Sequence, residues 1–428
     1  MKKILIQFNE ANFDVIKKYC SSNKLPSFQK ILNNFKSIET SSEKEYKNLE
    51  PWIQWYSFYS NLNFEEHGVF NLGDCLKNNH DNFLISEASK GNKVGVFSAM
   101  NCRPSDKFHT YLPDPWTEAE AKAGFFDKAV FNVVKKLVNE NAKLEISFKD
   151  LLGIIILIGI PNTFDDISII FNAIKSFFKK DRATLASIFD YFFGKYSLKR
   201  TRKSELDLSI FFLNGLAHVQ HHYMLNSSHV EGTNPLWYSN NNDSLLESLK
   251  IYDKLFKYID KKFSKSHELW VITGLSQEAY PDPFIYWRFK NHKELLNKFI
   301  DFDFTVYPRM TRDFEVHFDQ PDKLETILKF LNNAQILSGD KNIGKAFINI
   351  DITSKKSIFA SFAYSGSTTN IELLYENKKI PLENEINFIA LKNGGHIEKG
   401  WALTNKNIEF DNEVPIWNLS HYIFPKKG

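Results

Sequence analysis

Residues 49–68 read LEPWIQWYSFYSNLNFEEHG, and the rest of the chain is organised around this stretch. Pro51 suits the first turn of a helix, where its missing N–H costs nothing. The aromatic residues recur at spacings of three and four, on one side of that helix: Trp52, Trp55, Tyr56 and Tyr59. Glu50 therefore stands at a predicted helix N-terminus, beside backbone N–H groups with partial positive charge. It is either a residue that caps the helix or part of a site at the end of a strand.

Composition limits the class of protein. A chain of 428 residues exceeds the usual size of one domain, so we expect one large domain with an inserted part. The net charge of +3 gives no reason to expect nucleic acid as a partner. Three cysteines without CxxC spacing fit a reducing compartment, and MKKILIQFNE at the start reads as a strand. We therefore expect a cytoplasmic protein.

Short apolar runs alternate with segments of helical period. Strands are predicted over 3–8, 93–99, 207–213 and 268–273, and helices over 12–19, 28–35 and 244–263. This alternation predicts an α/β fold with a mainly parallel sheet sandwiched by helices. Ligands bind such sheets beyond the carboxyl ends of the strands, so polar residues after each strand are the site candidates. Residues 301–390 are strand-rich and mixed.

Residues 117–200 differ from the rest because they show helical period and few turn signals. We predict an all-helical insertion or cap on a core made of 1–116 and 201–428. Its apolar faces indicate packing over the sheet, or peripheral contact with a membrane or a protein partner. The most apolar run, 151–161, is about half of the ~20 residues that a spanning helix needs. A buried helix is expected there, with an interfacial segment as the alternative.

Several polar residues follow the predicted strands. Asn9 and Glu10 come after the first strand, Asn214 after the third and Gln277 after the fourth. The densest polar group is His218, Gln220, His221 and His222. His218 and His222 are four apart and would share a helical face, as in metal-binding pairs. The alternative is that these histidines are hydrogen-bonded to the backbone.

A last polar motif, NGGHIEKGW, spans 393–401. Its glycines allow a tight loop that presents His396. The sequence shows no glycine-rich phosphate loop, no GxSxG elbow and no dinucleotide fingerprint. The absence of these motifs counts against an NTPase, an α/β-hydrolase with a serine triad and a nicotinamide enzyme.

The order of these pieces resembles the alkaline phosphatase superfamily, nearest its type I phosphodiesterase and nucleotide pyrophosphatase branch. In that family the first strand ends in Asp-Gly, a nucleophile precedes a proline at a helix start, and the helix runs to His-Gly. Later come Asp-x-x-x-His, Ser-Asp-His-Gly and Gly-x-His. The positions that resemble them here are Asn9-Glu10, Glu50-Pro51-Trp52, His67-Gly68, Asn214 to His218, Thr273 to Ser276 and Gly394 to His396.

The resemblance implies at most one divalent metal, zinc or manganese, held by Asn214, His218 and His396. The family's second metal would need ligands at Gly274 and Leu275, whose side chains cannot bind one. Family members use two metals to stabilise the attacking and leaving oxygens of a phosphoryl or sulfuryl group.

A carboxylate stands where the family has an alcohol nucleophile. Two like charges about 4 Å apart repel by roughly 1 kcal/mol in water and by several at lower dielectric, so Glu50 opposes an anionic substrate group. Glu50 suits a general acid, a base, or a nucleophile toward a sugar carbon. Aromatic residues beside it suit stacking on sugar faces.

We therefore predict a diverged hydrolase or transferase for a small-molecule or glycan substrate that contains a sugar or a phosphate linkage. Polysaccharide or nucleotide-sugar metabolism is the expected setting. The predicted catalytic residues are Glu50, Glu10 and His218, and the predicted substrate contacts are Asn9, Trp52, His67, His222 and Gln277. Two alternatives stay open: a non-catalytic binding or scaffold protein of the same fold, and a conventional metal-dependent phosphodiesterase with Glu10 and Asp74 as ligands.

Overall fold

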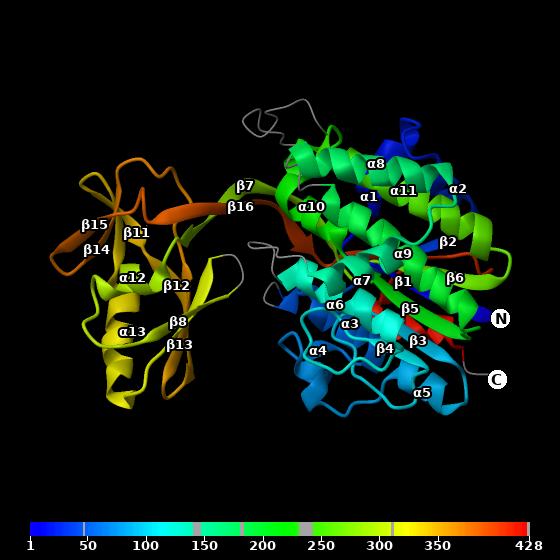
Figure 1. Cartoon of the computed structure of the whole chain (residues 1–428), viewed down its shortest axis with the longest axis horizontal. Coiled ribbons are helices and arrows are strands. Elements are labelled where there is room, and N and C mark those ends of the chain that lie inside the picture. Colours follow the sequence, from blue (N-terminus) through cyan, green and yellow to red (C-terminus); the bar gives the residue numbers. More distant parts are fainter. Residues whose placement is uncertain (46–47, 140–146, 180–183, 231–242, 310–311, 426–428) are drawn as a thin grey trace. The chain divides into compact units, whose positions relative to one another are not determined.

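The computed structural model describes residues 1–45, 48–139, 147–179, 184–230, 243–309 and 312–425 (Figure 1). The chain divides into two compact units. The large unit comprises Met1–Ala279 and Gly394–Gly428, and the small unit comprises Tyr280–Asn393. The strand-rich stretch 301–390 falls inside the small unit. The predicted separation of 117–200 from the core stays a prediction.

An eight-stranded sheet forms the centre of the large unit, in the order β18-β2-β17-β6-β1-β5-β3-β4. The run β6-β1-β5-β3-β4 is parallel throughout, and β17 joins it antiparallel. The strands are β1 Lys2–Phe8, β2 Lys36–Ser41, β3 Val94–Phe97, β4 Thr110–Leu112, β5 Leu208–Leu213, β6 His267–Ile272, β17 Lys399–Thr404 and β18 Val414–Pro415. All four predicted strands are confirmed, and so is the mainly parallel α/β fold.

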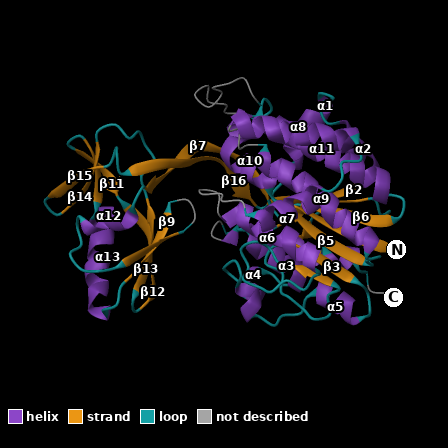
Figure 2. Cartoon of the chain, viewed as in Figure 1, coloured by secondary structure: helices purple, strands orange, loops and turns teal. Residues whose placement is uncertain are grey.

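Helices cover both faces of this sheet (Figure 2). Side chains alternate along β1, so that Ile4, Ile6 and Phe8 join one core while Leu5 joins the other. The first core receives α1 Phe13–Ser21, α2 Pro26–Asn34, α10 Gly215–Tyr223 and α11 Ser244–Phe263. The second receives α3 Pro51–Ser60, α5 Phe83–Ser89 and α14 Ser420–Ile423. The short α4 Phe64–His67 and the 3₁₀ turns Asp74–Lys77, Met224–Asn226 and Ile416–Asn418 connect these elements.

Four further helices pack on the first core: α6 Phe125–Asn139, α7 Phe148–Ile158, α8 Phe164–Lys179 and α9 Leu185–Lys203. The expectation of a buried helix over 151–161 is wrong for one face of α7. Leu157 is buried, but Leu151 and Ile155 are exposed, as is Ile160 beyond the helix. Within the described ranges, no helix has the length and apolar character needed to cross a membrane.

The small unit contains two four-stranded antiparallel sheets. Their strands are β8 Thr305–Pro308, β9 Asp313–His317, β10 Gln335–Ser338, β11 Lys341–Lys345, β12 Phe347–Ser354, β13 Ser357–Phe362, β14 Ile371–Tyr375 and β15 Lys378–Pro381. Residues of α12 His292–Asn297 and α13 Leu324–Asn333 share one apolar core with these strands; the turn Pro321–Lys323 precedes α13.

Two longer strands, β7 Ser276–Phe289 and β16 Ile386–Ile397, pair with each other. Each has residues in both units. The sequence predicted a tight glycine loop over 393–401, but Asn393 to Ile397 continue β16 in extended form. His396 therefore lies on a strand near its end.

Candidate functional site

Glu50 immediately precedes α3, as the sequence predicted. The helix runs from Pro51 to Ser60, and Asn61 after it adopts the left-handed conformation with φ of 59°. The Glu50 side chain makes no capping bond to the helix, so the interpretation of Glu50 as a simple helix cap is not supported. Its Oε2 atom lies 3.8 Å from Nδ1 of His396. The carboxylate is partly exposed and faces a histidine from a distant strand.

Glu10 lies just beyond the carboxyl end of β1. Its backbone has φ of 57°, an uncommon conformation for a residue with a side chain. The Glu10 N–H donates to the carbonyl oxygen of Thr273 at 2.9 Å, which ties this turn to the end of β6. The side chain is almost fully buried. Non-glycine residues in this region of backbone space tend to cluster at functional sites.

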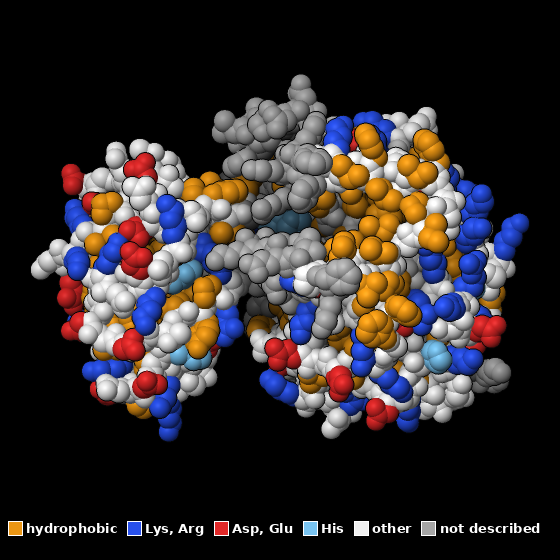
Figure 3. Space-filling view, in the orientation of Figure 1, with side chains coloured by type: hydrophobic (Ala, Val, Ile, Leu, Met, Phe, Trp, Pro, Cys, Tyr) orange, Lys and Arg blue, Asp and Glu red, His pale blue; other side chains and the backbone are white. Residues whose placement is uncertain are grey.

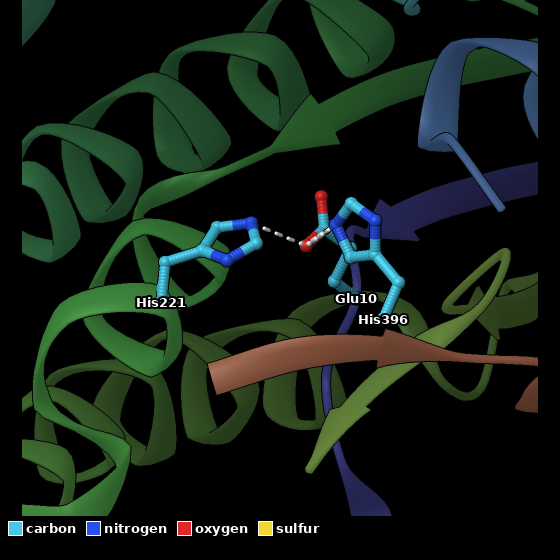
Figure 4. Close-up of side chains that lie close together, drawn as sticks. All are labelled: Glu10, His221 and His396. Atoms are coloured by element: carbon cyan, nitrogen blue, oxygen red, sulfur yellow. Dashed lines mark hydrogen bonds and ion pairs between the residues drawn. The ribbon is translucent and has the colours of Figure 1, made fainter. Parts of the chain in front are cut away.

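Two imidazoles converge on the Glu10 carboxylate (Figure 4). Oε2 of Glu10 is 3.1 Å from Nε2 of His221 on α10 and 3.0 Å from Nε2 of His396 on β16. The three residues each offer one ligand atom, and these atoms lie within 4.8 Å of one another. We call Glu10, His221 and His396 the carboxylate–imidazole group. It joins a strand end, a helix and a late strand at the carboxyl edge of the sheet.

A backbone carbonyl orients His221. Nδ1 of His221 is 3.1 Å from the carbonyl oxygen of Gly394. A carbonyl only accepts, so Nδ1 carries the hydrogen and Nε2 faces Glu10. This contact needs a glycine, because a Cβ at position 394 would lie 2.3 Å from the carbonyl oxygen of Gln220. Gly394 therefore allows β16 to approach α10 closely, whereas the sequence predicted that it would allow a tight loop.

The Glu10 carboxylate is held in its anionic form. Burial acts to raise its pKa, but the charges and hydrogen bonds of His396 and His221 hold the pKa well below its usual value. Asn9 Nδ2 donates to Oε1 at 2.8 Å, and Gln277 Nε2 donates to Oε2. These amide N–H groups and the two imidazoles together surround the carboxylate with partners that favour its negative charge.

The donor set fits a divalent metal. Zinc in catalytic sites takes three protein ligands at about 2.0–2.2 Å and keeps one position open. Ligands at that range stand about 3.3 Å apart around a tetrahedral ion, close to the 3.0 and 3.1 Å separations here. Donation of the other ring N–H to a carbonyl, as His221 does to Gly394, is the usual arrangement of a metal-binding histidine. Imidazole and carboxylate are both ligands that divalent metals such as zinc take in proteins.

Asn9 and Asn214 bond to each other. Asn9 Nδ2 donates to Oδ1 of Asn214 at 2.8 Å, and Asn9 Oδ1 accepts from Nε1 of Trp55 at 2.7 Å. These contacts hold the end of β1 against the start of α10 and against α3. The geometry favours a structural role for both amides over the predicted substrate contact of Asn9 and metal contact of Asn214.

His218 lies near the carboxylate–imidazole group but is not part of it. Its ring lies 4.7 Å from that of His222, and the rings of His221 and His396 are 5.0 Å apart. His218 is exposed as a whole residue. Desolvation, and then His222 and His221, lower the pKa of its imidazole to about 4. The ring of His218 therefore neighbours that of His222, and His218 is not one of the three residues of the carboxylate–imidazole group. Its predicted roles as ligand and catalytic residue stay predictions.

Three other predicted contacts have partners within the fold. Nδ1 of His67 accepts from the Val69 N–H at 2.9 Å and Nε2 lies 2.9 Å from Ser57 Oγ. Desolvation and His80 lower the pKa of His67 to about 4. Trp52 donates its indole N–H to the Phe70 carbonyl at 2.9 Å. The buried Gln277 also donates to the carbonyl oxygen of Ala217 at 3.1 Å. This geometry favours structural roles for His67 and Trp52, and a positioning role for Gln277.

His221 belongs to the carboxylate–imidazole group, but the ligand set predicted from the sequence does not include it. The spacing of four favoured His218 with His222, but the buried side of α10 is another face, which carries Leu216, Ala217, Val219 and Gln220. His221 lies next to Gln220 and four residues after Ala217, at the border of that inward face. The apolar stripe of the helix was the signal that would have placed it.

No protein-family model matches the sequence, and no curated protein does. Among solved structures, the chain is similar to murine ectonucleotide pyrophosphatase/phosphodiesterase 5, at 10% identity and a TM-score of 0.42, over 99% of this chain and 95% of that chain. It is similar to phosphonoacetate hydrolase from Sinorhizobium meliloti, at 11% identity and a TM-score of 0.43, over 99% and 94%. It is also similar to the alkaline phosphatase PafA, at 13% identity and a TM-score of 0.42, over 98% and 94%.

Two of these proteins are named as a nucleotide pyrophosphatase/phosphodiesterase and an alkaline phosphatase, enzyme names that also occur in the family that the order of motifs resembles. At such identities and TM-scores the likeness concerns the course of the backbone. The chemistry of this chain rests on its own side chains.

Proposed function

We propose that this protein is a single-metal hydrolase or transferase, with the metal held by Glu10, His221 and His396. The observation that carries the proposal is the convergence of one buried carboxylate and two imidazole nitrogens on one point, with the Glu50 carboxylate beside them. When bound, a zinc ion supplies positive charge that polarises a phosphoryl or carbonyl oxygen.

The chain's own residues then have distinct tasks. Glu10 and the two histidines fix the site, and Gln277 and Asn9 orient the Glu10 carboxylate through their N–H groups. Glu50 is the general base or acid, because it is the partly exposed carboxylate nearest the group. The Glu50 carboxylate takes a proton from, or returns one to, a hydroxyl or water of the reacting pair.

The charge of the proposed site limits the class of substrate. Glu10 and Glu50 bring two carboxylates to the site, against the two positive charges of one zinc ion. A dianionic phosphomonoester would then meet a neutral centre, whereas a diester or a sugar linkage carries less charge. We therefore favour a phosphodiester or glycosidic linkage in a glycan or nucleotide sugar over a phosphomonoester.

Metal analysis of the purified protein tests the site. We expect close to one zinc per chain in the wild type, and loss of that zinc in Glu10→Gln, His221→Ala and His396→Ala. His109→Ala is the matched control, because His109 is exposed before β4, at the amino edge of the parallel strands, and should keep the metal. A folded, metal-free wild type that takes up no zinc would refute the site and favour the scaffold alternative.

Turnover tests the chemistry. Chromogenic aryl phosphodiesters, aryl phosphomonoesters and aryl glycosides are compared on the zinc-loaded protein. Activity on a diester or glycoside that falls by about 10²–10⁴-fold in Glu50→Gln, with zinc retained, supports the role of Glu50. Full activity in that variant would refute it.

A further inference from the structure

The largest unexplained feature of the large unit is the outer face of α6, α7 and α8. Figure 3 shows hydrophobic side chains gathered over these helices, with Lys and Arg side chains around them. The exposed apolar residues of this face are Phe125, Phe126, Leu151, Leu152, Ile155, Ile160, Phe164, Ile167, Phe171 and Ile174. We call this set the apolar face.

The apolar face follows helical period, so it is a property of the folded helices. On α8, Phe164, Ile167, Phe171 and Ile174 recur at spacings of three and four on the solvent side. The opposite side of the same helix buries Ile169 completely. Large apolar side chains on the solvent side of a helix mark an interaction surface, and they suit a helix that lies at a membrane surface. Ile160 and Phe164 are each 85% exposed, so no described part of the protein covers these two residues.

The helices beneath the apolar face are firmly held. Asp166 of α8 pairs with Lys195 of α9 and accepts from Tyr191 at 2.8 Å. Burial acts to raise the pKa of Asp166, but these bonds bring it down to about 2. On α7, Gly153 lets α6 approach closely, since a Cβ there would lie 2.6 Å from the Ala129 carbonyl oxygen. The face is therefore presented on a packed support.

The charged side chains around the apolar face indicate which kind of partner it binds. Among the described residues from 125 to 175, each carboxylate is paired inside the protein: Asp127 with Arg200, Asp150 with Lys136, Asp165 with Lys257 and Asp166 with Lys195. Lys128, Lys135 and Lys175 are exposed, and no acidic side chain of the described chain pairs with them. Lys128 and Lys135 share the exposed side of α6 with Phe125, and Lys175 lies four residues after Phe171 on α8.

We propose that the apolar face seats the protein on an anionic lipid bilayer. Large apolar side chains enter the boundary between headgroups and acyl chains, and the three lysines contact anionic headgroups. A second copy of the chain fits less well, because a two-fold contact through this face would bring the same lysines together. The 11 residues of α7 suit a helix that lies in the surface.

Vesicle cosedimentation tests the proposal. The full chain is mixed with vesicles of phosphatidylcholine alone, or of phosphatidylcholine and phosphatidylserine in equal amounts. We expect binding to the anionic vesicles, weakened by salt. Ile160→Ser/Phe164→Ser/Phe171→Ser should bind more than about tenfold more weakly. Lys128→Glu/Lys135→Glu/Lys175→Glu should lose roughly fivefold or more for each lysine.

Phe388→Ser is the matched control, because Phe388 is 57% exposed in the small unit and should leave binding unchanged. Circular dichroism and thermal melting confirm that each variant is folded. No binding of the folded wild type to anionic vesicles overturns the proposal. So does equal binding by the apolar triple variant. Self-association without vesicle binding, abolished by that variant, also overturns it and assigns the face to a second copy.

Discussion

Gly394→Ala tests the approach of β16 to α10, on which the position of His396 depends. The added Cβ would lie 2.3 Å from the carbonyl oxygen of Gln220 and 2.7 Å from Oε1 of Gln277, whereas ordinary contacts begin near 3.4 Å. The nearest atom belongs to the backbone of a buried helix, so it cannot turn away. Strand and helix must separate by about 1 Å.

The cost follows from that separation. Overpacking of this kind destabilises a protein by about 1–3 kcal/mol, which lowers the melting temperature by several degrees. His396 lies two residues further along the strand, and the Gly394 carbonyl orients His221. A site of this kind tolerates displacements of only about 0.5 Å. Loss of an orienting contact typically weakens metal binding by about 10–100-fold.

The assay is thermal denaturation with and without zinc, together with a calorimetric zinc titration. Gly124→Ala is the matched control, because its Cβ would meet only Asp127 Oδ2, at 3.9 Å. We expect the control to keep both the melting temperature and the zinc affinity of the wild type. If Gly394→Ala does the same, β16 does not lie against α10 as described, and the carboxylate–imidazole group is wrongly placed.

Three further predictions follow from the same contacts. Burial raises the pKa of Asp190, which accepts from Tyr252 and Gly215, to about 7. The folded state therefore holds a proton that the unfolded state has lost above about pH 4. The contribution of this proton to the free energy of unfolding is complete below about pH 4 and lost by about pH 7. Denaturation at several pH values should show this fall in the wild type and not in Asp190→Asn. An equal fall in both proteins would contradict the prediction. A chelator should lower the melting temperature of the zinc-loaded wild type by several degrees and leave Glu10→Gln unaffected; an equal shift in both would place the metal elsewhere. Glu50→Gln should bind zinc as the wild type does, because Glu50 lies outside the group; loss of zinc in that titration would make Glu50 a ligand.

The α/β fold was readable from the sequence because buried parallel strands are short continuous apolar runs. The runs at 3–8 and 207–213 pair as β1 and β5, and 244–263 is a helix as predicted. Glu10 was a candidate because it follows the first strand, whereas Glu50 was one because it precedes Pro51 at a helix start and His396 because it follows two glycines.

What the sequence did not reveal depends on contacts between distant residues. NGGH looks like a loop locally, but pairing with β7 and packing on α10 keep it extended. His221 and His218 are equally polar, and only the direction in which α10 packs decides which of them meets Glu10. The separate core of residues 280–393 likewise depends on strand pairings that no short window of sequence contains.

Glu10 and His396 are 386 positions apart in the chain. A ribosome that adds about 5–20 residues per second separates their synthesis by roughly 20–80 s. The sheet, by contrast, has most of its parallel strands by residue 272. In the proposed metal site, loading would therefore be a late event in biogenesis, and a polypeptide released early would carry most of the parallel sheet without the His396 ligand.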